Sequence, residues 1–88
     1  MDTTEKISAD PALVRAIDRI RASLDGQVVD RGRVVDHLLD LRILAADDGA
    51  RLVVTDLDRL LADLPGRTLV ERTWIDDRLA TLAASLPA

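Results

Sequence analysis

The stretch RGRVVDHLLDLRILAADDG, residues 31–49, decides the fold. Its apolar residues recur at helical spacing and cover most of the circumference of the helix they predict, which we expect to begin between Asp30 and Arg33 and to end near Ala46. Asp47, Asp48 and Gly49 form its stop signal. A helix that is apolar nearly all round is usually central in a fold or pinned at two interfaces. The sequence therefore predicts a central helix with other helices packed around it.

Three further amphipathic helices are predicted on either side of this stretch. The first begins at Asp10-Pro11, an N-cap followed by a proline suited to the first helical position, and closes at Gly26 as a left-handed cap. Another covers residues 50–64, with a start at Thr55 and a weak capping box to Asp58 as the alternative. Their apolar stripes sit at positions three and four apart, and they are Leu13, Ile17, Ile20 and Leu24 in the first, and Val53, Leu57, Leu60 and Leu64 in the other.

The last predicted helix begins near Thr68 or Thr73. Each of these threonines is followed three residues later by an acid, which is the spacing of a capping box. Residues 27–32 are predicted to be a loop, because Val28-Val29 is too short a run to indicate a strand and is expected to tuck under the helices. No internal repeat is evident. The short connections favour antiparallel neighbours, and the predicted fold is all-α: a small four-helix bundle, with antiparallel or orthogonal packing of short helices.

Length and composition set the remaining bounds. Eighty-eight residues fit one domain, and we expect residues 1–9 to be a disordered lead-in and residues 10–88 a single helical domain. The net charge of −4, without a basic run, disfavours binding to nucleic acid and to acidic membrane surfaces. Residues 1–10 are polar and carry no apolar signal core, and no apolar stretch approaches the roughly 20 residues of a membrane span. The chain is expected to be cytoplasmic, and its preference for Arg over Lys and for Asp over Glu indicates a high-GC, bacterial coding bias.

The chain lacks the residues from which active sites are usually built. It has no Cys, Tyr or Phe, and a single His, His37. An enzyme usually needs a nucleophile with its base, a cluster of metal ligands or a phosphate-binding loop, so we expect no catalytic residue, no cofactor and no metal. His37 lies beside Asp36 with Asp40 one turn further on, but a metal site needs more ligands than one histidine supplies. The preferred interpretation is a structural histidine on the side of its helix.

Four residues are candidates for a protein interface: Arg42, Trp74, Leu39 and Val35. Arg42 falls within the apolar arc of its helix, where a charge must be paired, extended to water or turned toward a partner. The plain alternative is an arginine whose stem packs on the bundle while its head meets an aspartate of another helix. Trp74 is either a plug at one end of the core or an interface anchor.

The sequence therefore predicts a non-catalytic interaction module, adaptor or accessory subunit. It would act through an apolar helix face with arginine contacts, and the partner would be another protein or a second copy of the chain. The alternative is a small regulator, either an acidic antitoxin-like protein or a helix-turn-helix transcription factor made from residues 31–64. In that case the reading helix would carry Asp56, Asp58 and Asp63, which would repel phosphate.

Overall fold

The computed structural model describes residues 11–86, which form four helices and two short strands. In chain order these are α1 (Pro11–Ser23), β1 (Val28–Asp30), α2 (Arg31–Asp47), α3 (Arg51–Asp63), β2 (Leu69–Glu71) and α4 (Arg72–Ser85). The all-α class is confirmed in this coarse sense, because helices dominate and the sheet has only two strands. The predicted lead-in at residues 1–9 lies outside the described residues.

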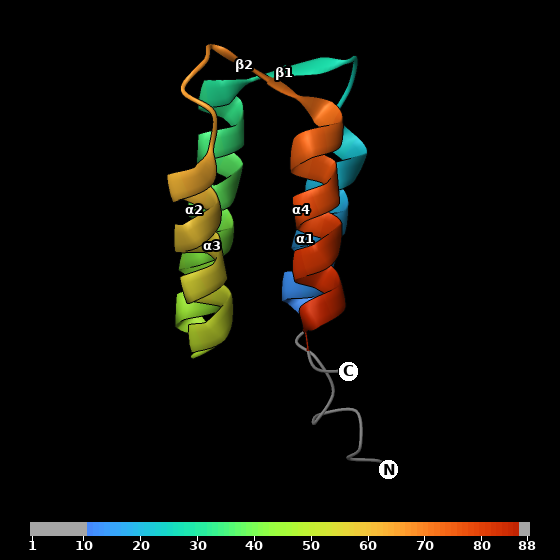
Figure 1. Ribbon diagram of the computed structural model, residues 1–88. Coiled ribbons are helices and arrows are strands. Elements are labelled where there is room, and N and C mark those ends of the chain that lie inside the picture. The colour runs from blue at the N-terminus through green and yellow to red at the C-terminus, as the bar shows by residue number, and fades with distance from the viewer. Residues whose placement is uncertain (1–10, 87–88) are drawn as a thin grey trace.

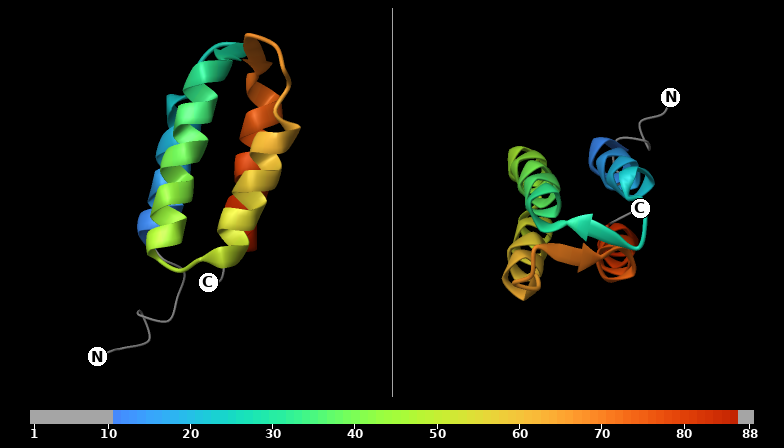
Figure 2. Two further views of the ribbon diagram at one scale, coloured as in Figure 1. Left: turned by 90° about the vertical axis from the view of Figure 1, so that its left-hand side faces the viewer. Right: turned by 90° about the horizontal axis from the view of Figure 1, so that it is seen from above.

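Seen from the end that carries the strands, the four helices occupy the corners of a square (Figure 2). Each helix packs against the two at adjacent corners, and α1 closes the ring by contacting α4. The ribbon of β1 and β2 crosses one end of the helices (Figure 1). It is antiparallel, with Val29 opposite Val70 at its centre.

The core is aliphatic and fills the space between the four helices. The predicted stripes of α1 and α3 all face it, although Leu24 is only partly buried. From α2 and α4 it receives side chains with the same spacing, namely Val34, Leu38 and Leu41 from α2, and Ile75, Leu79 and Leu82 from α4. Val29 and Val70 cover one end of this core, since each points inward from its strand while its neighbours point out.

Residues 11–86 divide into two halves with the same order of elements, so the expectation of no internal repeat is wrong. Each half is a helix, a strand and a second helix, α1–β1–α2 and α3–β2–α4. Leu13, Ile17 and Ile20 are buried in the first half, and Val53, Leu57 and Leu60 are buried 40 positions later in the second. The strands and following helices match at a spacing of 41, beginning with Val29-Asp30-Arg31 and Val70-Glu71-Arg72.

An arginine at the start of the second helix of each half reaches into the loop of the other half. The Nε of Arg31 donates a hydrogen bond to the carbonyl of Pro65 at 2.8 Å, and the Nε of Arg72 donates one to the carbonyl of Gly26 at 2.7 Å. Their backbone N–H groups donate to Thr68 and Gln27 in the same loops, at 2.8 and 2.9 Å. These reciprocal bonds tie the two halves together beside the ribbon.

Replacing either arginine should therefore loosen the end of the fold that carries the ribbon. Arg31→Ala should lower the free energy of unfolding by about 1–2 kcal/mol, because its hydrogen bond to Pro65 is partly buried, and Arg72→Ala by about 0.5–1 kcal/mol, because water can replace its exposed bond to Gly26. Arg67→Ala is the control, because Arg67 is exposed in the second loop and takes part in neither bond. Urea unfolding followed by circular dichroism measures the difference. Equal stability of all three variants would contradict this role.

Three of the predicted boundaries require correction. Residues 28–30 form a strand and not a loop, because Val29 pairs with Val70 far along the chain. The start near Thr68 is wrong, since residues 69–71 are the partner strand. The alternative start near Thr73 is confirmed to within one residue, because α4 begins at Arg72, although its N-cap is Glu71 and not a threonine. The helix predicted over residues 50–64 is confirmed as α3, and only the alternative start at Thr55 is wrong: α3 begins at Arg51, and the Thr55 hydroxyl donates to the Arg51 carbonyl within the helix.

The turns after α1 and α2 depend on glycine. Gly26 has a φ of +76° and Gly49 a φ of +72°, both in the left-handed region that glycine enters without strain. The expectation for Gly26 is confirmed in its conformation, although α1 ends at Ser23. At Gly49 the chain reverses from α2 into α3, which lie side by side (Figure 2).

Candidate protein-interaction site

Several large apolar side chains remain exposed although the core is filled without them. Leu39 and Ile43, one turn apart on α2, are 43% and 61% exposed, and Leu52 at the start of α3 is 81% exposed. Val28 and Leu69 lie on the outer face of the ribbon. Single exposed apolar residues are ordinary, but a contiguous group on one helix is typical of an interaction surface. Leu39 and Ile43 form such a pair.

Arg42 forms an ion pair with the neighbouring helix. Its Nε donates to the Asp58 carboxylate of α3 at 2.6 Å, and a second, longer bond runs from Nη2 to the other carboxylate oxygen. This hydrogen bonding raises the pKa of Arg42 and lowers the pKa of Asp58. Both side chains are substantially exposed. This ion pair is the alternative in which the Arg42 head meets an aspartate of another helix. The role of Arg42 as an interface anchor stays a prediction.

The other candidates differ in their surroundings. Val35 is half-buried and packs against the core, whereas Leu39 on the next turn is exposed. Trp74 is also half-buried against the core, and the Arg78 guanidinium lies over its ring at 4.0 Å from the centroid, a cation–π arrangement. The structure does not bring the four candidates together. Arg42, Leu39 and Val35 belong to α2, while Trp74 belongs to α4 at the diagonally opposite corner (Figure 2).

Two grooves run between consecutive helices on opposite sides of the molecule, one in each half. The groove between α1 and α2, of about 560 Å³, has an apolar floor formed by Ala16, Ile20, Leu41 and Leu44. Its polar lining includes Arg19 from α1, and His37, Asp40 and Asp47 from α2. The exposed Ile43 forms part of its rim.

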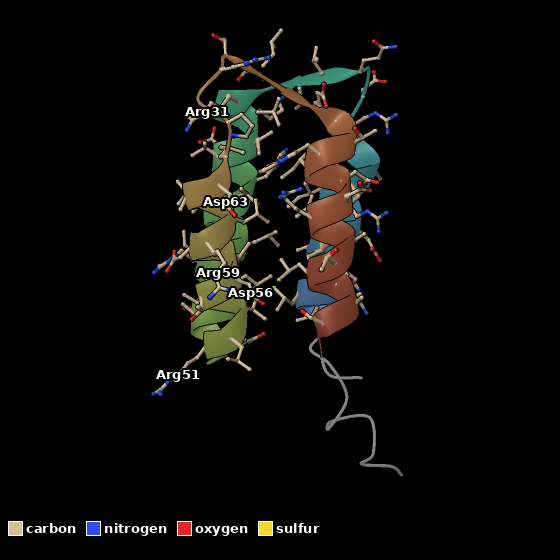
Figure 3. All side chains as sticks on the ribbon, in the orientation of Figure 1. Arg31, Arg51, Asp56, Arg59 and Asp63 are labelled. Atoms are coloured by element: carbon tan, nitrogen blue, oxygen red, sulfur yellow. The ribbon has the colours of Figure 1, made fainter. Side chains whose placement is uncertain are left out.

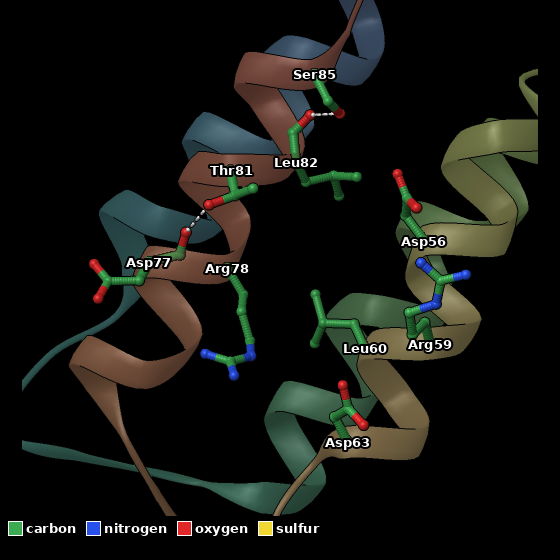
Figure 4. A pocket seen from close by; sticks show the side chains of 9 residues that line it. All are labelled: Asp56, Arg59, Leu60, Asp63, Asp77, Arg78, Thr81, Leu82 and Ser85. Carbon is green, nitrogen blue, oxygen red and sulfur yellow. Dashed lines mark hydrogen bonds between the residues drawn. The ribbon is translucent and has the colours of Figure 1, made fainter.

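The groove between α3 and α4, of about 400 Å³, occupies the equivalent place in the second half. Leu60 and Leu82 extend toward one another across it (Figure 4). Most of the remaining lining is charged, with Asp56, Arg59 and Asp63 from α3, and Asp77 and Arg78 from α4. Figure 3 shows four of the charged residues of α3, which follow one another along the helix in the order Arg51, Asp56, Arg59 and Asp63.

His37 lies in the first groove with Asp40, and Arg78 occupies its place in the second. Within residues 11–86, no three His, Cys, Asp or Glu side chains come close enough together to hold a metal ion. None of the four helices is long and apolar enough to cross a membrane.

The α2–α3 pair differs in geometry from a helix-turn-helix. The two helices run antiparallel and side by side (Figures 1 and 2), whereas the helices of a DNA-binding helix-turn-helix cross at about 90–120°. The polar side of α3 presents Asp56 and Asp63 into the second groove, and Asp58 is held by Arg42.

A second ion pair joins α1 to α4. The Arg21 Nε donates to the Asp76 carboxylate at 2.8 Å, and this hydrogen bond lowers the pKa of Asp76, with nearby Arg72 adding to the effect. Because the pKa of Asp76 is lower in the folded protein than in the unfolded chain, the pair contributes stability above about pH 4 and loses it as the pH falls through the folded pKa.

Replacing Asp76 should accordingly change how the free energy of unfolding depends on pH. The free energy of unfolding of Asp76→Asn should fall less between pH 5 and about pH 3 than that of the unmodified protein. Asp77→Asn is the control, since Asp77 is the exposed neighbour outside the ion pair. Urea titrations at stepped pH measure the slope. An unchanged slope in Asp76→Asn would show that the ion pair does not act in solution.

Sequence reasoning identified Leu39 but missed Ile43 and the groove beside it. In the sequence Ile43 is one of many apolar residues of α2, and only the packing of α1 and α3 on either side reveals that it is left uncovered. The sequence did carry one sign of this exposure, because α2 has more apolar residues than a single buried stripe can hold.

No protein-family model matches this chain, and neither does any curated protein or solved structure.

Proposed function

We propose that this protein is a non-catalytic, cytoplasmic interaction module whose four helices act as one antiparallel bundle and present α2 to another protein chain. The observation that carries this proposal is the exposure of Leu39 and Ile43, one turn apart on a helix that is otherwise tied into the core. Burying apolar side chains is the main favourable term in most protein association. The filled core gives these two residues no structural role within the fold.

The charged residues around α2 support recognition more than chemistry. The Arg42–Asp58 ion pair anchors α2 to α3 beside the exposed leucine and isoleucine. Polar and charged groups at the edge of an apolar patch are typical of protein interfaces. A rigid helix that carries the patch would lose little conformational entropy on binding.

The experiment is affinity purification of tagged protein from the cells that encode it, in the presence of a second, differently tagged copy. We expect one protein, or the second copy, at near-stoichiometric amounts. Ile43→Gln should reduce its recovery at least about tenfold, a change in binding energy that the loss of one buried side chain readily supplies. Ala84→Gln is the matched control, because Ala84 is exposed at the position in α4 that corresponds to Ile43.

Both variants should unfold at the same temperature as the parent protein, because both positions are exposed. Recovery of neither a second protein nor the second copy would overturn the proposal. Recovery that is insensitive to Ile43→Gln would overturn the assignment to α2.

A further inference from the structure

The two halves share one fold, but their grooves have diverged in chemistry. Arg19 of the first groove has an arginine counterpart, Arg59, in the second, but three positions on α2 are apolar or acidic where α4 has a polar or small residue. At the rim Ile43 corresponds to Ala84, on the floor Leu44 corresponds to Ser85, and on the wall Asp40 corresponds to Thr81. Because the second half folds in the same way without these residues, the fold does not require them. The α1–α2 groove therefore carries features that packing within the chain leaves unexplained.

The charges of the α1–α2 groove are separated between its walls. Arg19 lies on the α1 wall, and Asp40 and Asp47 lie on the α2 wall. All three are exposed, and none belongs to the two ion pairs found within residues 11–86. A uniformly basic helix would be repelled by Arg19, and a uniformly acidic one by the two aspartates. The matching surface has basic and acidic charges on opposite sides.

A second copy of the same face has this arrangement. A two-fold axis brings a patch against itself, so that every contact between two different residues occurs twice, once in each direction between the copies. Turning the α1–α2 face onto itself about an axis parallel to the helices places the α1 wall of each copy opposite the α2 wall of the other. The unpaired Arg19 of each copy would then face Asp40 and Asp47 of the second copy. Ile43 would be removed from water in both copies at once.

We propose that the protein forms a two-fold symmetric homodimer through the α1–α2 face, with Arg19 of each copy against Asp40 and Asp47 of the other. This deepens the proposed function, because it names the partner of the exposed α2 surface. The α3–α4 face, whose groove alternates acids and bases on both walls and lacks the apolar rim, remains outside the dimer.

The test uses two full-length variants that separate the charges. Arg19→Asp places acid against acid, and Asp40→Arg/Asp47→Arg places base against base, so each variant alone should dissociate. Mixed together they restore opposite charges at both contacts. Light scattering after size exclusion, at up to about 0.5 mM protein, should give twice the 9.6 kDa mass for the parent protein. It should give the single mass for either variant, and the double mass again for the equimolar mixture.

We expect the dissociation constant to rise at least about tenfold in each variant and to return within about threefold of the parent in the mixture. Arg59→Asp and Thr81→Arg are the controls, because these exposed residues occupy the corresponding positions of the second groove. Both should leave the dimer intact. Circular dichroism verifies that all variants fold.

A parent protein that stays at the single mass, or variants that keep the double mass, would overturn the dimer. So would a mixture that stays dissociated, since loss of the dimer would then not come from the paired charges. The same experiments distinguish failure of the homodimer from failure of the proposed function. If the parent is monomeric but retains a different protein in a manner that depends on Ile43, the interaction module stands and the homodimer falls.

Discussion

Leu38→Ala should lower the free energy of unfolding by about 2–5 kcal/mol, a large fraction of the stability expected of a domain of this size. Leu38 is fully buried on the core side of α2. Truncation removes its contacts and leaves a cavity that the surrounding helices can only partly close. Leu79→Ala should have a comparable effect, because Leu79 is equally buried at the equivalent position of α4.

The neighbouring residue supplies the control. Leu39→Ala changes the same atoms at an exposed site on α2 and should shift stability by no more than about 0.5 kcal/mol. Urea unfolding monitored by circular dichroism gives the free energies, and the fluorescence of Trp74, the only tryptophan, gives an independent signal from α4. A small effect of Leu38→Ala would mean that the core is not packed between α2 and the other helices as described.

Val70→Asn should be as damaging, with an expected loss of about 3–5 kcal/mol. Val70 is only 1% exposed and points from β2 onto the end of the core. Asparagine at this position loses the apolar burial of valine and buries an amide among aliphatic side chains that cannot hydrogen-bond to it. The ribbon would have to separate for that amide to reach water.

The control for this prediction is the next residue of the same strand. Leu69 is 51% exposed on the outer face of the ribbon, so Leu69→Asn introduces the same amide where water can solvate it. We expect a change below about 1 kcal/mol. Thermal unfolding of both variants measures the difference. Similar losses in both would show that the ribbon tolerates polar groups on either face and does not seal the core.

The positions of the helices could be predicted from the sequence, whereas the ribbon could not. Each stripe of buried residues has helical spacing, so α1 and α2 begin within a residue or so of the predicted positions. A strand of three residues has too few positions to show an alternation, and Val29 acquires its partner only when Val70 is brought beside it. The duplication leaves a trace in the sequence, since Arg19 and Arg59 are identical at a spacing of 40 and Leu38 and Leu79 at a spacing of 41. The change of spacing between the first helix and the strand of each half, and differences such as His37 against Arg78, obscure it.

Only the part of the candidate site that lies on α2 could be predicted from the sequence. The position of Arg42 within the apolar arc indicated that its charge needs a partner, and an aspartate of another helix fulfils that role. The α1–α2 groove depends on residues from two helices, and no pattern along one of them indicates which floor and wall residues face each other. The same limit applies to the reciprocal bonds of Arg31 and Arg72, whose acceptors are backbone carbonyls of distant loops.

The ribbon also has a consequence for the order of folding. Its paired residues are some 40 positions apart, as for Val29 and Val70, while the α2–α3 contacts form across the short turn at Gly49. Closing the shorter loop costs less chain entropy and therefore comes first. The helix pairs then hold the strands near one another before the strands join. Substitutions in the ribbon should for this reason accelerate unfolding and leave the refolding rate almost unchanged. The ribbon would then slow the unfolding of a core that assembles before the strands pair.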